Sequence, residues 1–417
     1  MTGDINGLSP ETLAVTLGYA STSAFGAVKP PAVMTTTFVY QSAQHSKDVH
    51  EAFFNGTGPA VGASDAYIYT RLGHPNLTMV ETRLAALDGA PASAVYCSGM
   101  AAITTTLLAF LRPGDSAVCS RPCYGGTDGY LTTVLPDFGI TTFGMGDGCD
   151  EASIRSAVAE AMAAGPLRLI HLESPANPTA AIVDIAAVAR ISAELSSAQG
   201  FRPIILVDNT FLGPLLQSPL AEGADLCMTS LTKYCGGHSD LMAGGVSGSV
   251  ELVTRLKALR TLSGNHLDPF SAWLLLRSFE TLPLRTDRAC SSARQVAEFL
   301  RGHPKVAGVT YLGFIEGAAR TVFDRQCRGT GSTFSFHLRG DEAEAFRLLD
   351  ALKLLRLAVS LGGSETLICN PATTTHYQTP RERREAGGIF PGTMRVSVGL
   401  EAPADLIADL AQALDKV

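Results

Sequence analysis

The sequence predicts an α/β fold in which a large, mainly parallel sheet is followed by a smaller C-terminal α/β unit. Between about residues 70 and 260, apolar strand patterns alternate with helical patterns, which is typical of parallel strands covered by helices on both faces. After about residue 275 this pattern changes, and helices alternate with amphipathic strands. The chain has 417 residues, of which 46% are apolar and 17% charged, enough for a large buried core.

The elements of the first unit follow from short apolar runs and from longer segments with helical spacing. The predicted strands are 94–97, 117–119, 167–172 and 203–207, and the predicted helices are 100–111 and 184–198. The Arg-Pro-Gly-Asp segment at 112–115 predicts a turn.

In the C-terminal unit, the predicted helices 293–301 and 342–352 alternate with the predicted strands 333–338 and 394–398. The first 70 residues show weak periodicity and many turn formers. We therefore expect an extended N-terminal arm over 1–70, a large domain over 71–275 and a C-terminal domain over 276–417.

Charge and composition exclude several classes of function. The formal net charge is −7 and no dense run of Lys or Arg occurs, so we expect no binding to nucleic acid. The basic residues Arg381, Arg383 and Arg384 are mixed with Glu382 and Glu385, which predicts a solvated surface turn. No apolar run approaches the ~20 residues of a membrane helix, so we expect no membrane partner.

The nine cysteines are irregularly spaced, without a Cys-x-x-Cys pair or a His partner at zinc-finger spacing. They predict free thiols and no metal site. The first ten residues lack the basic start and apolar core of a signal peptide. A reducing, cytoplasmic location is therefore expected.

The strongest local signal is the segment 225–234, DLCMTSLTKY. A predicted strand leads into Ser230, Thr232 and Lys233. Hydroxyl groups can bind phosphate oxygens, and a neighbouring Lys can form an imine with an aldehyde cofactor. Taken alone, a Lys flanked by Ser and Thr is more often an ordinary surface residue.

Three further motifs favour a cofactor-binding role for Lys233 over an ordinary surface position. Asp208 follows a buried strand at the edge where open α/β sheets bind ligands, so it suits either a pyridinium partner or a satisfied turn. The Ser98-Gly99-Met100 turn joins a predicted strand to a helix, where free N–H groups suit a phosphate. Tyr124 precedes two glycines and suits either stacking on a cofactor ring or a tight turn.

Together these motifs resemble the Cys/Met-metabolism (trans-sulfuration) family of fold-type I pyridoxal-phosphate (PLP) enzymes. That family includes methionine γ-lyase, cystathionine γ-lyase, cystathionine γ-synthase and the O-acylhomoserine sulfhydrylases. The resemblance runs from about Thr12 to the C-terminus. It implies the fold-type I architecture, a PLP-binding domain over 71–275, and pyridoxal 5'-phosphate held as a Schiff base on Lys233.

The resemblance also implies roles for other residues. Asp208 matches the acid on the pyridine nitrogen, Asn177 the residue near the phenolic oxygen, and Tyr124 the stacking and proton-transferring Tyr. The implied phosphate ligands are Ser98, Gly99, Met100, Ser230 and Thr232, with Tyr69 and Arg71 reaching into the neighbouring subunit. The implied substrate contacts are Val359, Ser360, Thr375 and Arg395, of which Arg395 would clamp the amino-acid carboxylate.

A site completed by Tyr69 and Arg71 implies an obligate homodimer, and the family habit is a tetramer. The implied chemistry begins when Lys233 takes the α-proton of an amino acid. Departure of a γ-substituent then leads either to a 2-oxo acid and ammonia or to replacement by a nucleophile.

The pocket residues bear on that choice. Cystathionine lyases tend to carry Glu where this chain has Val359, and Arg where it has Asp128 and Gly129. Val359 is the methionine γ-lyase pattern, although those lyases usually place Cys at the position of Gly126. We therefore expect γ-elimination from a methionine-like substrate, with a non-sulfur leaving group possible. The alternative is γ-replacement on an O-acylhomoserine, and a catalytically silent scaffold or an aminotransferase also stays open.

Overall fold

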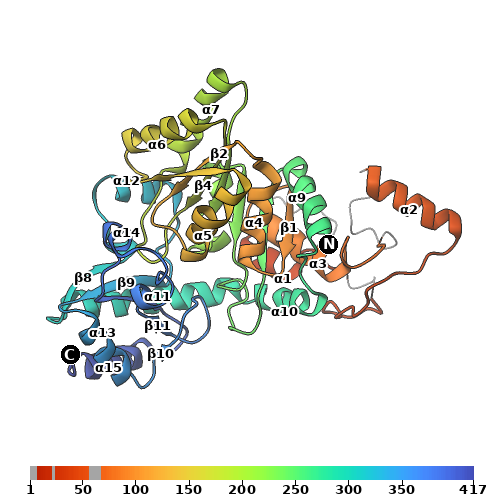
Figure 1. Cartoon of the computed structure of the whole chain (residues 1–417). Coiled ribbons are helices and arrows are strands. Elements are labelled where there is room, and N and C mark those ends of the chain that lie inside the picture. Colours follow the sequence, from red (N-terminus) through yellow and green to blue (C-terminus); the bar gives the residue numbers. More distant parts are fainter. Residues whose placement is uncertain (1–6, 21–23, 56–66) are drawn as a thin grey trace.

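The computed structural model describes residues 7–20, 24–55 and 67–417, and two sheets dominate these residues (Figure 1). The larger sheet has seven strands in the order β1-β7-β6-β5-β4-β2-β3. They are β1 (Ala92–Tyr96), β2 (Ser116–Ser120), β3 (Thr141–Met145), β4 (Leu167–Glu173), β5 (Ile204–Asp208), β6 (Leu226–Thr229) and β7 (Gly244–Gly248).

Most of these strands run in the same direction. The pairs β2–β3, β2–β4, β4–β5 and β5–β6 are parallel, whereas β7 lies antiparallel between β6 and β1. The mainly parallel sheet predicted from the sequence is therefore confirmed. As a result, β1, β2, β4, β5 and β6 all end at one edge of the sheet.

Helices cover both faces of the larger sheet. Successive strand residues point to opposite faces, so each face forms a core of its own with its helices. On one face, α4 (Gly99–Phe110) and α9 (Val250–Ser263) pack on residues such as Cys119. On the other face, α6 (Glu151–Ala164) and α7 (Ile185–Gln199) pack on residues such as Val118. Further along, α3 (Pro75–Leu87) and α10 (Pro269–Phe279) form a third core with β1.

The C-terminal part contains a five-stranded sheet in the order β10-β11-β12-β9-β8. Its strands are β8 (Val306–Thr310), β9 (Thr333–Leu338), β10 (Arg356–Leu357), β11 (Leu367–Cys369) and β12 (Thr393–Ser397). Its helices are α11 (Leu282–Gly302), α12 (Gly317–Gln326), α13 (Glu342–Ala351), α14 (Arg381–Ala386) and α15 (Pro403–Leu414). Phe334 and Phe336 of β9 pack with α11, α13 and α15 in one core.

The N-terminal arm is partly helical, which the prediction of an extended arm missed. Ser9 caps α1 (Pro10–Thr16), and the buried Arg83 of α3 donates hydrogen bonds to the carbonyls of Ala14 and Leu17, which hold α1 in place. Figure 1 shows α2 (Ala43–Asn55) standing away from the sheets. Residues 1–6, 21–23 and 56–66 of the predicted arm lie outside the described residues.

The two sheets draw their strands from residues 92–248 and 306–397. Phe211 and Leu212 of the first part pack against Leu312 and Phe323 of the second. The division at residues 70 and 275 into domains stays a prediction. Within the described ranges, no helix has both the length and the apolar character to cross a bilayer.

Candidate active site

Five loops meet at the carboxyl edge of the larger sheet. The loops after β1, β2, β4 and β6 carry Ser98, Tyr124, Asn177 and Lys233, respectively, and Asp208 is the last residue of β5, before the fifth loop. Because the five strands run in one direction, residues far apart in the sequence converge here. The edge therefore collects one representative of each predicted motif.

Lys233 follows β6, and its Nζ donates a hydrogen bond of 2.7 Å to Ser360 Oγ from the C-terminal part. Burial, together with the positive charge of Arg395, lowers the pKa of Lys233 from 10.5 to about 8. A larger share of the amine is consequently neutral near physiological pH, and the neutral amine is the nucleophilic form.

Ser360 and Arg395 form the opposite wall of the site. Ser360 has a φ of 92°, a conformation that is strained for a residue with a Cβ. The guanidinium of Arg395 donates to the Ser360 carbonyl at 2.7 Å and to Asn177 Oδ1 at 3.1 Å. Arg395 is only 2% exposed, and its Nε is buried without a hydrogen-bond partner among the residues described. This orphan donor suits an anionic ligand.

Two buried acids lie side by side where β4 and β5 end. Glu173 and Asp208 are register partners in this parallel pair. Burial and the nearby Asp208 raise the pKa of Glu173 to about 8, and burial raises the pKa of Asp208 as well. Asp208 accepts a hydrogen bond from the Thr210 N–H, and Thr210 Oγ1 accepts one from the Ser230 N–H. Asp208 is thereby linked to the loop of Lys233.

The Ser98-Gly99-Met100 turn forms a tight cradle at the first turn of α4. A Cβ on Gly99 would lie 2.8 Å from Ser230 Oγ, so the α4 N-terminus and Ser230 lie close together. A Cβ on Gly244 would lie 2.2 Å from the Ser98 carbonyl oxygen. The cradle joins free N–H groups of a helix end to a hydroxyl group, an arrangement suited to a phosphate.

Not every predicted hydroxyl is free for a ligand. Ser98 Oγ caps α4 by accepting a hydrogen bond from the Ala101 N–H at 3.0 Å. Thr232 Oγ1 donates to the Ala243 carbonyl at 3.1 Å and accepts from the Ala243 N–H at 3.0 Å. In this geometry, Ser98 and Thr232 shape the loops around the cradle through their hydroxyl groups.

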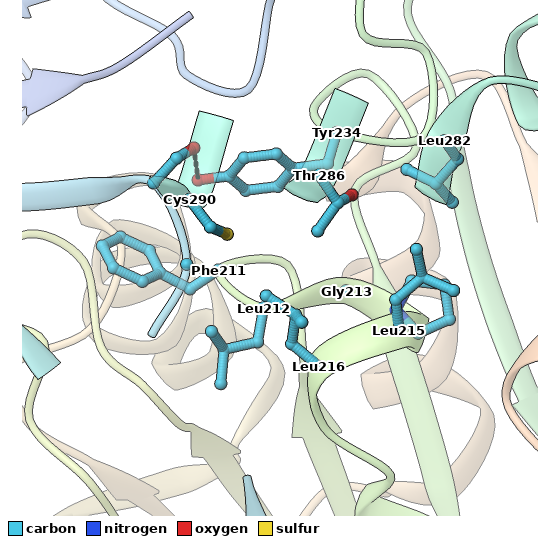
Figure 2. Close-up of a pocket in the computed structure, with 12 residues that line it drawn as sticks. Phe211, Leu212, Gly213, Leu215, Leu216, Tyr234, Leu282, Thr286 and Cys290 are labelled. Carbon is cyan, nitrogen blue, oxygen red and sulfur yellow. Dashed lines mark hydrogen bonds between the residues drawn. The ribbon is translucent and has the colours of Figure 1, made fainter. Parts of the chain in front are cut away.

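Tyr234 fixes the backbone next to Lys233. Its hydroxyl forms hydrogen bonds with Thr333 and Ser332. Figure 2 shows its ring beside Cys290, above an apolar wall that includes Leu212 and Leu216. The cavity has a volume of about 10 Å³, room for about one water molecule. It is too small for a substrate, and Lys233 does not line it.

Tyr124 lies at the start of α5 (Gly125–Gly129), and its side chain is exposed. A Cβ on Gly126 would lie 2.7 Å from the Tyr124 ring and 3.4 Å from Met100 Sδ, so these three residues are neighbours. A Cβ on Gly125 would lie 2.2 Å from the Thr375 carbonyl oxygen. The segment of Tyr124, Gly125 and Gly126, called the tyrosine loop, therefore packs on Met100 of the cradle on one side and on Thr375 on the other.

The basic cluster near residue 383 lies at the surface, as the sequence predicted, but it is a short helix and one of its arginines forms an ion pair with an acid outside the cluster. It forms the short helix α14, and Arg383 donates to both carboxylate oxygens of Asp128 at 3.0 Å. Arg121 lies 3.4 Å from the same carboxylate. The prediction missed this because the partner, Asp128, is distant in sequence. The pairing ties the C-terminal part to α5, which begins beside Tyr124.

Tyr69 and Arg71 lie apart from this group. Both are exposed, and the Arg71 guanidinium donates to the Thr261 carbonyl at the end of α9 and lies over the Tyr69 ring. No contact joins either of them to Lys233 within the described part of the chain.

Comparisons with known proteins identify the family. A family model described as "Cys/Met metabolism PLP-dependent enzyme" matches residues 11–415. The chain belongs to this family. It is 38% identical to an L-methionine gamma-lyase from Pseudomonas deceptionensis, over 97% of this chain and 96% of the relative. It is 34% identical to cystathionine gamma-synthase 1, chloroplastic, from Arabidopsis thaliana, over 94% of this chain and 66% of the relative.

A solved structure supports the same assignment. The crystal structure of metB from Corynebacterium glutamicum superimposes with a TM-score of 0.88 at 32% sequence identity, covering 99% of both chains. The fold-type I architecture is thereby confirmed, and the chain is a PLP-dependent enzyme. The residues at the sheet edge fit this cofactor, because a buried amine, an acid and a phosphate cradle lie at one edge.

One buried residue of the site, Glu173, was not among the predicted site residues. Glu173 closes β4 as Asp208 closes β5, and the same signal, an acid at the end of an apolar strand, identifies both. The carboxyl group of Glu173 accepts hydrogen bonds from the N–H groups of both Tyr124 and Asn177.

Proposed function

We propose that this PLP enzyme catalyses γ-elimination from an amino acid with a γ-leaving group, methionine-like, to give a 2-oxo acid and ammonia. The observation that carries this proposal is the hydrogen bond between Lys233 Nζ and Ser360 Oγ, beside Arg395 and its unpaired Nε. A buried amine with a lowered pKa suits proton transfer, and the adjacent guanidinium suits an amino-acid carboxylate.

The cofactor would be held by three groups of residues. Lys233 would carry it covalently, and Asp208 would face its ring nitrogen. Ser230 and the N–H groups of Gly99 and Met100 would bind its phosphate. When bound, PLP acts as an electron sink for the charge left after a proton leaves the substrate.

The protein's own residues would orient the substrate and move its protons. Arg395 would fix the substrate carboxylate, with Asn177 and the Ser360 carbonyl holding the guanidinium in place. Lys233 Nζ, once the substrate amine has displaced it from the cofactor, would take the α-proton, and its hydrogen bond to Ser360 would hold the amine near Arg395. Tyr124, at the mouth of the site, would assist proton transfer when the γ-substituent departs.

The mouth of the site favours an uncharged leaving group. Val359 is 53% exposed and offers no charge to a distal ammonium group. A Cβ on Gly129 would meet nothing within 4 Å, which leaves open space on α5. The carboxylate of Asp128 is engaged by Arg383. Val359 and α5 thus suit a thioether better than the charged end of cystathionine, and a non-sulfur leaving group of similar polarity is compatible with them.

The second candidate function is γ-replacement on an O-acylhomoserine. It is favoured by Gly126, which stands where methionine γ-lyases of the family usually place Cys, and by the similarity to a cystathionine gamma-synthase. The Tyr124 ring and Met100 lie against Gly126, where a side chain such as Cys would stand.

Substrate trials separate the two candidates. The purified holoenzyme is incubated with L-methionine, L-cystathionine and O-acetylhomoserine, each with and without a thiol. We expect 2-oxobutanoate from L-methionine without added thiol. If a thioether forms from O-acetylhomoserine with the thiol, and 2-oxobutanoate never appears, the replacement function is correct instead.

We also propose that the enzyme is a homodimer with shared active sites, assembled further into a tetramer, in the cytoplasm. Support for sharing comes from Tyr69 and Arg71, which are exposed and make no contact with Lys233 among the described residues. Exposed apolar side chains on the arm, such as Met34 and Val39, suit burial against a second copy. All nine cysteines are free, which fits a reducing compartment.

A further inference from the structure

Glu173 connects two functional loops through its carboxylate. Its Oε2 accepts a hydrogen bond of 2.7 Å from the Tyr124 N–H, and its Oε1 accepts one of 2.7 Å from the Asn177 N–H. The residue itself is held by a hydrogen bond of 2.9 Å from its own N–H to Ser120 Oγ, and it is 4% exposed. Both oxygens are therefore occupied by backbone donors of the site.

Only a carboxyl group offers one acceptor oxygen to each of the two donors. A glutamine of the same shape has one acceptor oxygen and would turn an NH₂ group toward the second N–H. An apolar residue would leave both N–H groups buried without a partner, which destabilises a loop. The acid itself is unfavourable here, because it is buried beside Asp208. A role in stability alone thus explains the position poorly.

The contacts of Glu173 belong to a longer network. From Asn177, the side-chain oxygen accepts from Arg395, and Arg395 donates to the Ser360 carbonyl. Ser360 Oγ in turn accepts from Lys233 Nζ. Glu173 thereby joins the tyrosine loop on one side of the site to Arg395 and Lys233 on the other. Such networks fix relative positions better than separate contacts do.

We propose that Glu173 is a positioning residue that sets Tyr124 relative to Arg395 and Lys233. The proposal rests on the function proposed above, because it assumes that Tyr124 and Lys233 act on the same substrate. Glu173 touches neither substrate nor cofactor in this account. It acts through the two backbone N–H groups, so that the separation between the tyrosine ring and the guanidinium stays fixed.

The test compares Glu173→Gln with a matched control. Glu401 also accepts two short hydrogen bonds through its two oxygens, from the N–H and hydroxyl of Thr366 in the C-terminal part, and among the described residues its carboxyl group has no hydrogen bond to Tyr124, Arg395 or Lys233. We expect kcat to fall roughly 10- to 100-fold in Glu173→Gln, as expected for displaced reacting groups, with a smaller change in KM. Glu401→Gln should lose thermal stability and keep kcat. Unchanged kcat in folded Glu173→Gln would overturn the proposal.

A double-mutant cycle with Tyr124→Phe identifies the route of the effect. If Glu173 acts through Tyr124, Glu173→Gln should reduce kcat much less in the Tyr124→Phe background than in the unmodified enzyme. Effects that simply multiply would contradict the proposal. Should Glu173→Gln fail to fold, Glu173→Asp carries the same cycle, since it keeps both acceptor oxygens but retracts them from the loops.

The visible circular dichroism of the bound cofactor provides a readout that needs no turnover. A ring held against Tyr124 gives an asymmetric environment, so we expect the signal to fall in Glu173→Gln while the cofactor stays bound in equal amount. An unchanged signal would overturn the positioning role. If the unmodified enzyme turns over none of the trial substrates, the proposed function fails, yet this signal still decides the role of Glu173.

Discussion

At the scale of single residues, the proposed chemistry depends on whether the Lys233 amine is protonated. The ammonium form is unfavourable where the side chain is buried near Arg395, so the pKa falls to about 8. The unfolded chain keeps the ordinary value near 10.5. The folded protein therefore releases the proton first, and the contribution of Lys233 to stability rises as pH increases from about 8 to 10.5.

The same pKa predicts how the enzyme without cofactor captures PLP. The neutral amine reacts, so the rate of covalent attachment should rise with pH around a midpoint near 8. The measurement is the growth of visible absorbance after PLP is added at a series of pH values, with Lys233→Arg as the background. A midpoint near 10.5, the value of a free lysine, would show that the amine is not desolvated.

At the scale of elements, the α4 N-terminus and the loop after β6 must approach closely. Gly99 permits this approach, because any side chain there would contact Ser230. The strand β7 permits it from the other side, since Gly244 lies against the Ser98 carbonyl. The cradle is thus built from glycines whose backbone lies against the Ser230 side chain and the Ser98 carbonyl.

We expect Gly99→Ala to weaken PLP binding about tenfold, because displacing Ser230 by overpacking costs roughly 1–3 kcal/mol. Equilibrium titration of the enzyme without cofactor measures this change. Gly302→Ala is the matched control, since a Cβ at that helical position meets nothing within 4 Å. Equal affinities of the two variants would argue against Gly99 and Ser230 as the phosphate cradle.

At the scale of the whole molecule, the proposed dimer places Tyr69 and Arg71 in the partner's site. The variant Arg71→Ala loses the Arg71 side chain but keeps Lys233. The variant Lys233→Ala loses the lysine but keeps Arg71. A mixed dimer of these two inactive variants contains one site in which both residues are intact. If sites are shared, the mixed dimer is therefore active although each variant alone is inactive.

Co-expression of Arg71→Ala with Lys233→Ala should restore about a quarter of the unmodified activity if subunits pair at random. Co-expression of Arg395→Ala with Lys233→Ala is the control. These two residues act within one chain, so each site of that mixed dimer keeps a defect and activity stays absent. Equal activity from both mixtures would mean that sites are not shared between subunits.

The sequence was sufficient for the parallel sheet and for the segments that converge at its carboxyl edge. Short apolar runs identified β1, β2, β4 and β5, and the acid or Lys after a strand marked the carboxyl edge. The sequence did not predict β7, because three of its five residues are glycines, which obscure a strand pattern. The structure explains these glycines, because a side chain would collide with a close neighbour. A Cβ on Gly245, for example, would lie 2.3 Å from Leu84 Cδ2.

Contacts between distant segments were also beyond the sequence. Asp128 and Arg383 are 255 positions apart, and only the fold brings them together. Thr232 was expected to bind phosphate through its hydroxyl, and in the structure this hydroxyl forms hydrogen bonds with the backbone of Ala243. The Ser98 hydroxyl caps α4. The phosphate-binding roles of both residues stay predictions. In each case the residue type was informative, whereas its partner depended on tertiary structure.

The most direct test of the account is to locate the cofactor on the chain. The holoenzyme is reduced with borohydride, which makes the link between cofactor and lysine permanent, and its peptides are analysed by mass spectrometry. We predict that the added mass lies on Lys233 alone, and that Lys233→Ala folds but carries none and does not turn over substrate. Label on another lysine, or turnover by Lys233→Ala, would contradict the central role of Lys233.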